Sequence, residues 1–126
     1  MVDAALYDTS ALIAELRVSE LVGVSVMSFA ELRIGVLRAG TTAARATRLE
    51  RLHRLEGVVA PFDVDRRVSG EYARIASLLR DEGRAVRTID TLIAATAVSV
   101  GLPLVTLDGD FSAIARIAGL ELVPAM

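Results

Sequence analysis

Short runs of apolar residues alternate along the chain with longer segments that mix apolar and polar positions. The apolar runs predict buried strands at 4–7, 22–26, 58–62, 104–107 and 120–123. The longer segments predict a helix from Thr9 to about Arg17, followed by helices at 28–37, 42–55, 65–82, 89–100 and 111–117. Strands that alternate with helices in this way are typical of parallel sheets. We therefore expect an α/β sandwich.

Capping and stop signals set the expected helix boundaries. Thr9 or Ser10 can cap the first helix, and Ser28 followed by Glu31 three residues later forms a capping-box pattern for the second. Glycine commonly follows the end of a helix, and three predicted helices are followed by glycines, at 40, 83 and 101. The segment 42–55 carries an arginine at every third position among its leucines. This mixed face predicts a surface helix or part of an interface.

Composition narrows the possible functions. A chain of 126 residues with 53% hydrophobic and 24% charged residues fits one compact domain, which we assign to 1–126. It has no cysteine, which excludes disulfide frameworks, zinc ribbons and thiol nucleophiles. All 14 basic residues are arginine, so mechanisms that need a lysine are excluded as well. The net charge of −2 argues against nucleic-acid binding through global charge and leaves room for a local basic face.

Hydropathy raises the question of a membrane segment, because its mean of +0.51 is high. The apolar stretch 91–105 is interrupted by Gly101 and Pro103. It is also shorter than the roughly 20 residues of a spanning helix. The N-terminus carries Asp3 and Asp8 in place of a basic signal region. We expect a cytoplasmic protein with no membrane segment, whose surplus apolar surface is covered by a partner or a second subunit.

Five carboxylates stand at or near the ends of predicted elements: Asp8, Glu31, Asp90, Asp108 and Asp110. Ligands of parallel sheets bind at the carboxyl ends of the strands, so we expect these acids at that edge. Each acid also has a structural explanation: a helix cap for Asp8, the capping box for Glu31, the helix dipole for Asp90, and a turn for Asp108 and Asp110. Gathered together they would repel one another and require a hard cation, Mg²⁺ or Mn²⁺. Two such ions suit phosphodiester hydrolysis, because they activate a water and stabilise the leaving oxygen.

Four segments carry these acids with distinctive neighbours, and their order and spacing form a recognisable pattern. They are Asp8–Ile13 (DTSALI), Ser28–Gly35 (SFAELRIG), Asp90–Ala95 (DTLIAA) and Thr106–Phe111 (TLDGDF). Together they resemble the PIN-domain family, and more narrowly the VapC toxins of bacterial toxin–antitoxin pairs. The likeness extends over residues 6–123. It implies a three-layer α/β/α sandwich with a mainly parallel sheet and a Mg²⁺-dependent endoribonuclease.

The resemblance also implies roles for the acids. Asp8 and Asp90 correspond to the principal metal ligands. Glu31 and Asp110 correspond to the remaining members of an acidic, catalytic quartet. Asp108 is the alternative to Asp110 as the fourth acid, and both are further candidate metal ligands.

Further expectations concern hydroxyls, arginines and partners. Thr9 and Thr106 match hydroxyl positions beside the family's site, with hydrogen-bonding roles. Arg87 is the arginine nearest the site in sequence and a candidate contact for RNA phosphates, with Arg33 and Arg38 as further candidates. The resemblance implies a homodimer and a small VapB-like antitoxin whose tail enters the acidic groove. Two alternatives to an RNA-cleaving toxin are a PIN-like nuclease or phosphoesterase acting on DNA, and an RNA-binding module without strong catalysis.

Overall fold

A computed structural model describes residues 4–14 and 22–124 of the chain. Its four short strands are all parallel and form one sheet in the order β2-β1-β3-β4. The strands are Ala5–Tyr7 (β1), Val22–Val24 (β2), Leu104–Thr106 (β3) and Leu122–Pro124 (β4). The helices are Thr9–Ile13 (α1), Val26–Leu37 (α2), Thr42–Val58 (α3), Arg66–Asp81 (α4), Thr88–Val100 (α5) and Phe111–Ala118 (α6).

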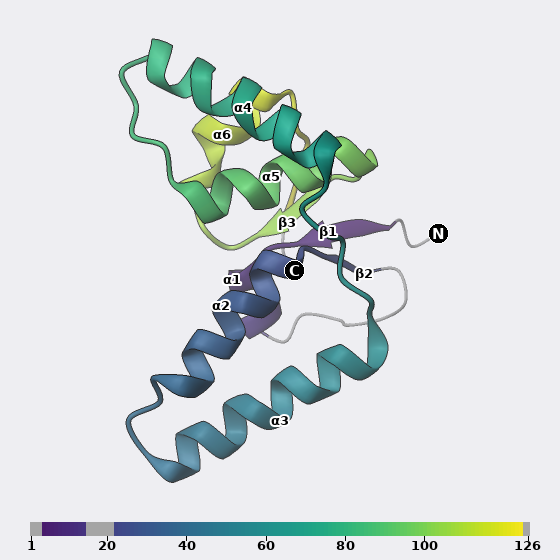
Figure 1. The fold of residues 1–126 in the computed structure, drawn as a ribbon, viewed down its shortest axis with the longest axis vertical. Helices are drawn as coiled ribbons and strands as arrows, with labels where there is room; N and C mark the ends of the chain where they lie inside the picture. Colours follow the sequence, from purple (N-terminus) through teal and green to yellow (C-terminus); the bar gives the residue numbers. More distant parts are fainter. Residues whose placement is uncertain (1–3, 15–21, 125–126) are drawn as a thin grey trace.

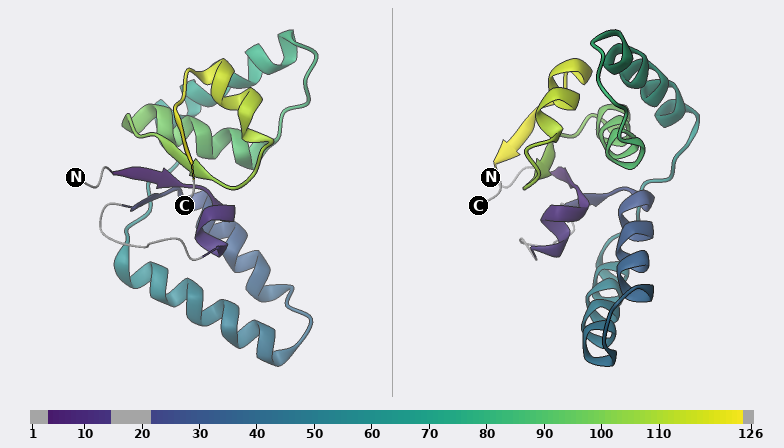
Figure 2. Two further views of the ribbon diagram at one scale, coloured as in Figure 1. Left: turned by 180° about the vertical axis from the view of Figure 1, so that it is seen from behind. Right: turned by 90° about the vertical axis from the view of Figure 1, so that its left-hand side faces the viewer.

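The helices form two layers, one on each face of the sheet (Figures 1 and 2). Helices α4, α5 and α6 cover one face, where Leu6 and Leu104 of the sheet belong to the same buried cluster as Ile93 of α5. Helices α1, α2 and α3 cover the other, where Val24 of β2 shares a cluster with Leu52 of α3. The predicted three-layer α/β/α sandwich with a parallel central sheet is therefore confirmed.

Several predicted boundaries are confirmed and others are wrong. Helix α4 begins after its cap, Asp65, and the glycines at 83 and 101 follow α4 and α5 with φ of 73° and 72°, which glycine adopts readily. Helix α2 ends at Leu37 and is capped by Arg38, so Gly40 belongs to the connection to α3. The predicted extension of the first helix to Arg17 lies outside the described residues.

The segment 58–62 is not a strand, contrary to the sequence prediction. Helix α3 continues past Leu55 to Val58, and Phe62 forms only an isolated bridge to Ser25. The bridge cannot grow into a ladder because β2 ends at Val24 and the chain turns into α2 at Val26. The predicted strand 22–26 is shortened for the same reason.

None of the helices within 4–14 and 22–124 is long and apolar enough to cross a membrane. Helix α3 is a surface helix, as its mixed pattern predicts: it buries Leu52 and Leu55, and its arginines lie at or near the surface. Figure 1 shows α2 and α3 as a hairpin of helices that extends away from the sheet.

The carboxyl ends of β1 and β3 lie side by side, because Tyr7 pairs with Val105 in the sheet. Asp8 therefore leaves β1 next to Thr106, the last residue of β3. Helices α1 and α6 start at this edge of the sheet, and the first turns of α2 and α5 approach it. This arrangement brings the predicted acids together.

Candidate active site

Asp8 lies at the end of β1 and is buried, with only 3% of its surface exposed. Its Oδ1 accepts hydrogen bonds from the backbone N–H of Ala11 at 2.9 Å and from Ser10 Oγ at 2.7 Å. Its Oδ2 accepts one from Thr106 Oγ1 at 2.6 Å. The first bond makes Asp8 the N-cap of α1, so the capping interpretation is confirmed and Thr9 and Ser10 are not the cap. Three neutral donors hold this carboxylate at the site edge.

Thr106 connects the two loops that leave β1 and β3. Its Oγ1 donates to Asp8 and accepts the backbone N–H of Asp108 at 2.9 Å. Ser10 Oγ lies 3.4 Å from Thr106 Oγ1 and accepts the backbone N–H of Leu107 at 3.0 Å. The sequence pattern by itself predicts no site role for Ser10. The feature that could have indicated one is its place in the first turn of a helix that directly follows a strand, two residues after an aspartate.

Glu31 extends from α2 toward α1, where its Oε1 accepts a hydrogen bond from Thr9 Oγ1. The same hydroxyl lies 3.2 Å from Ser28 Oγ, which is fully buried. The capping box predicted from Ser28 and Glu31 is wrong, because the N-cap of α2 is Ser25, whose Oγ accepts the N–H of Met27 at 3.1 Å. Both residues are thus inside the helix and free to contact α1.

The remaining three acids share one cation, Arg87. Its Nη2 lies 2.8 Å from Asp90 Oδ2 and 3.5 Å from Asp108 Oδ2, and its Nη1 lies 2.7 Å from Asp110 Oδ2. Asp90 is in the first turn of α5, and its side chain is 15% exposed. Asp108 Oδ1 also accepts the N–H of Asp110 at 2.9 Å, which confirms the turn interpretation for this pair. The phosphate contact of Arg87 stays a prediction, since carboxylates engage its guanidinium in this structure.

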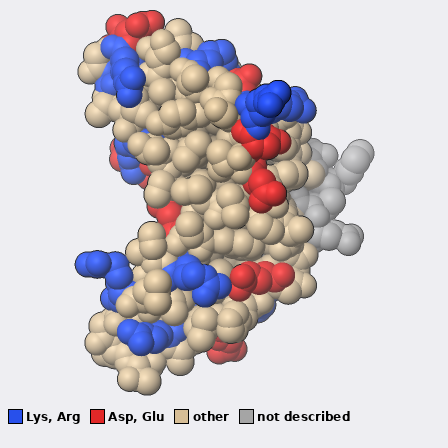
Figure 3. Space-filling model, viewed as in Figure 1, with Lys and Arg blue, Asp and Glu red and all other residues tan. Residues whose placement is uncertain are grey.

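Electrostatics place Asp90 at the centre of the acidic group. Burial raises the pKa of Asp90, Arg87 opposes that effect, and the negative charges of Glu31, Asp108 and Asp8 raise the pKa further. Burial would lower the pKa of Arg87, but Asp90, Asp108 and Asp110 outweigh this effect and raise it. All five predicted acids therefore lie at one edge of the sheet. In Figure 3 acidic and basic side chains alternate along the left-hand side, where the surface is hollowed between the upper and lower helices.

The chemistry of the site suits a hard divalent cation, because the candidate ligand atoms at this edge are carboxylate and hydroxyl oxygens. Burial first, and then repulsion from the neighbouring acids, raise the pKa of Asp90, and a divalent cation at this edge would offset both effects. Within the described residues, however, no three acidic, histidine or cysteine side chains converge closely enough to hold a metal ion. Arg87 supplies the positive charge for three of the acids instead.

Known proteins share this fold. Residues 5–117 match the family described as the PIN domain. The chain belongs to the PIN-domain family. Within that family it is similar to VapC ribonucleases of Mycobacterium tuberculosis: it is 38% identical to Ribonuclease VapC5 over 129 residues, covering 95% of this chain and 94% of that protein. It is also 41% identical to Ribonuclease VapC4 over 91 residues, covering 72% of this chain and 69% of that protein.

Solved structures agree with these matches. The crystal structure of VapBC-5 from Mycobacterium tuberculosis, a member of the VapBC family of toxin–antitoxin systems, superposes with a TM-score of 0.86 at 38% identity. That match covers 98% of this chain and 100% of the chain compared. VapBC2 from Rickettsia felis shares the fold at 18% identity, with a TM-score of 0.80 over 98% of this chain and 99% of that one.

Proposed function

We propose that this protein is a metal-dependent endoribonuclease and the toxin of a toxin–antitoxin pair. The observation that carries the proposal is the gathering of Asp8, Glu31 and Asp90 at the carboxyl edge of the sheet, close enough for Asp8 and Glu31 to raise the pKa of Asp90. The similarity to proteins named as VapC ribonucleases favours RNA over DNA as the substrate.

The proposed roles of the acids are those that the resemblance of their four segments to the PIN-domain family implies. Asp8 and Asp90 would be the principal ligands of Mg²⁺ or Mn²⁺, with Glu31 and Asp110 completing the quartet and Asp108 as the alternative fourth acid. A divalent cation held there would lower the pKa of a water molecule and would stabilise the charge that develops on a phosphodiester.

The hydroxyls orient the acids. Thr106 and Ser10 fix both oxygens of Asp8, and Thr9 fixes Glu31, so their carboxylates keep their orientation when charge at the site changes. Arg87 would contact a substrate phosphate with donors that now face Asp90, Asp108 and Asp110. Asp110, whose side chain is 74% exposed, is the partner that a phosphate would replace most readily.

The test is cleavage of total cellular RNA by the purified, antitoxin-free protein with Mg²⁺, with Mn²⁺ and with EDTA. We expect discrete fragments that require metal and that disappear in Asp8→Asn, which keeps an oxygen to accept the N–H of Ala11. Asp65→Asn is the matched control, because Asp65 also caps a helix through a 2.9 Å bond to a backbone N–H. Cleavage that persists in EDTA, or in Asp8→Asn, would contradict the metal mechanism. Parallel assays on a DNA oligonucleotide of the same sequence separate a ribonuclease from a DNA-directed enzyme.

The proposal includes a VapB-like antitoxin as partner, supported by a groove beside the site. A hollow of about 610 Å³ between α1, α2 and α3 is lined by Ile13, Glu31, Leu32, Gly35, Ala43, Ala44, Thr47, Arg48 and Arg51. Ile13 is 49% exposed there, and Arg51 Nε is buried without a hydrogen-bond partner within the described residues. An antitoxin segment with apolar side chains would cover Ile13 and supply an acceptor to Arg51.

A homodimer is a separate part of the proposal. It is supported by large apolar side chains that remain exposed in the single chain, among them Leu37 at 68% and Leu107 at 54%. Light scattering on the purified protein would show about twice the chain mass of 13.4 kDa if the dimer forms, and the chain mass itself if it does not.

A further inference from the structure

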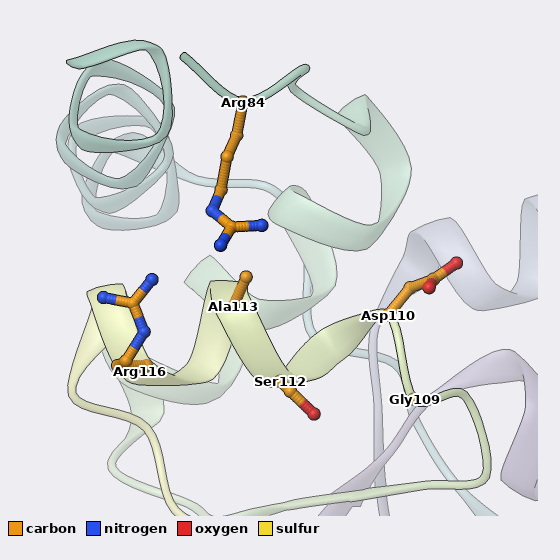
Figure 4. A pocket seen from close by; sticks show the side chains of 6 residues that line it. All are labelled: Arg84, Gly109, Asp110, Ser112, Ala113 and Arg116. Atoms are coloured by element: carbon orange, nitrogen blue, oxygen red, sulfur yellow. The ribbon is translucent and has the colours of Figure 1, made fainter. Parts of the chain in front are cut away.

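Two arginines outside the group of five acids line a hollow on α6. The hollow has a volume of about 430 Å³ and is lined by Arg84, Gly109, Asp110, Ser112, Ala113 and Arg116. Figure 4 shows the side chains of Arg84, from the loop after α4, and Arg116, from α6, reaching toward the same space above Ala113, while Ser112 points away from it. The lining is therefore basic on the side away from Asp110.

Glu82 holds the two arginines close together. Arg116 donates to it through both Nη atoms, at 2.8 and 3.1 Å, and Arg84 donates through Nε at 3.2 Å. These bonds, that of Arg116 first, lower the pKa of Glu82 to about 2, so Glu82 stays ionised at neutral pH. One carboxylate opposes two guanidinium groups, and the cluster keeps a surplus positive charge. Side-chain exposures of 52% for Arg84 and 57% for Arg116 leave donors accessible to a ligand.

This hollow is continuous with the acidic site. A second hollow of about 300 Å³ is lined by Leu79, Arg84, Ala85, Arg87, Asp110, Ala113 and Ile114, so it shares Arg84, Asp110 and Ala113 with the first. Arg87, which lines it, contacts three acids of the site. A path lined by Arg87, Arg84 and Arg116 therefore leads away from the acids along α6. The carboxylate that lines it, Asp110, and the neighbouring Glu82 are both already paired with arginines.

We propose that the hollow between Arg84 and Arg116 binds a backbone phosphate of single-stranded RNA whose reacting phosphate lies at the acidic site. The inference rests on the proposed ribonuclease function and adds the direction in which the strand leaves the site. Arginine suits this role because its planar fork matches phosphate oxygens. At a net charge of −2 the molecule as a whole does not attract RNA, so binding is expected to depend on local basic contacts of this kind.

The test is the binding of a fluorescein-labelled oligouridylate, followed by fluorescence anisotropy in EDTA so that no cleavage is needed. We expect Arg84→Gln and Arg116→Gln each to weaken binding by about tenfold, the effect of losing a charge-assisted hydrogen bond. The double variant should also reduce the slope of log affinity against log salt by about 0.7 for each phosphate that the protein no longer neutralises.

Arg74→Gln is the matched control, because Arg74 is 43% exposed and also paired with a glutamate, Glu71. Melting curves of all variants confirm that they fold.

Unchanged RNA affinity in the double variant, or an equal loss in Arg74→Gln, would overturn the inference. A second measurement is the binding of inorganic phosphate to the same variants. If phosphate binds through Arg116 while RNA affinity does not depend on it, the hollow takes a free anion and the inference also fails. Arginine-dependent RNA binding by a protein that does not cleave would refute the ribonuclease and leave this site in place. Normal cleavage and unchanged RNA binding by the double variant would refute this phosphate site and leave the proposed ribonuclease in place.

Discussion

The two halves of the acidic edge hold their carboxylates in different ways. On the β1 side, Asp8 is buried and held by a backbone N–H and two hydroxyls. On the α5 side, Asp90, Asp108 and Asp110 share the guanidinium of Arg87. Neutral donors fix a carboxylate without cancelling its charge, whereas an arginine cancels the charge and competes with any other cation. Hydrogen bonds fix the geometry of the first half, and in the second half the proposed metal ion would take the place of the arginine.

This contrast predicts equal losses of cleavage but opposite changes in stability for variants of the two halves. Asp90→Asn and Asp8→Ala should each reduce cleavage by at least about 100-fold, since each removes a proposed metal ligand. In metal-free protein, Asp90→Asn should leave the free energy of unfolding unchanged or higher, because burial first, and then neighbouring acids, already disfavour the charge of Asp90. Asp8→Ala should lower it by about 1 kcal/mol or more, because α1 loses its cap.

Urea unfolding in EDTA, beside the cleavage assay, measures both quantities on the same preparations. A large loss of stability in Asp90→Asn would favour the purely structural interpretation of that residue, as a charge that stabilises the start of α5. An unchanged stability in Asp8→Ala would show that its three hydrogen bonds do not stabilise the fold.

A smaller effect is expected from Thr106→Val, which removes the hydroxyl that orients Asp8 and keeps the shape of the side chain. It leaves Asp8 Oδ2 and the N–H of Asp108 without this partner, so the free energy of unfolding should fall by about 1–3 kcal/mol. Cleavage should fall by about 10-fold to 100-fold, the usual cost of losing a group that orients a ligand. Thr96→Val is the control, because the Thr96 hydroxyl donates only to Leu92 of its own helix, and it should leave cleavage unchanged. Equal activity of the two variants would contradict the orienting role.

The sequence predicts the first half of the site better than the second. Asp8 follows the apolar run 4–7 and Thr106 lies near the end of the run 104–107, and the carboxyl ends of parallel strands meet at one edge of the sheet. The pairing of Arg87 with Asp108 and Asp110 joins residues 21 and 23 positions apart, so it depends on how α5 and α6 pack. Ser28 and Ser25 both satisfy the rules for a helix cap and both are buried, but it is Ser25 whose Oγ accepts the N–H of Met27, while Ser28 contacts Thr9. The run at 58–62 has the composition of a strand, but the sheet offers it only Ser25 to pair with.

The exchange of Arg87 for a metal ion can be tested without any RNA. Arg87→Gln should bind Mg²⁺ roughly fivefold more tightly than the unaltered protein, since a competing positive charge near three carboxylates is worth about 1 kcal/mol in a solvated setting. The readout is the rise in melting temperature with Mg²⁺ concentration, which reports binding to the folded state. Arg74→Gln removes the same charge elsewhere and should leave the Mg²⁺ dependence unchanged. Weaker Mg²⁺ binding in Arg87→Gln would mean that Arg87 positions the acids for the metal instead of competing with it.

The smallest effect concerns an ionic cluster outside the acids, where Glu82 joins Arg84 and Arg116. These partners lower the pKa of Glu82 from its ordinary 4.5 to about 2, so ionised Glu82 stabilises the folded state. That contribution is complete above pH 4.5 and is lost as the pH falls toward about 2. The stability difference between the unaltered protein and Glu82→Gln should therefore be constant near neutral pH and shrink across this acidic range.

Glu71→Gln, which removes the same charge from α4, shows how much of the change comes from net charge alone. A difference that does not depend on pH would mean that Glu82 acts through packing and that its arginines do not depend on its charge.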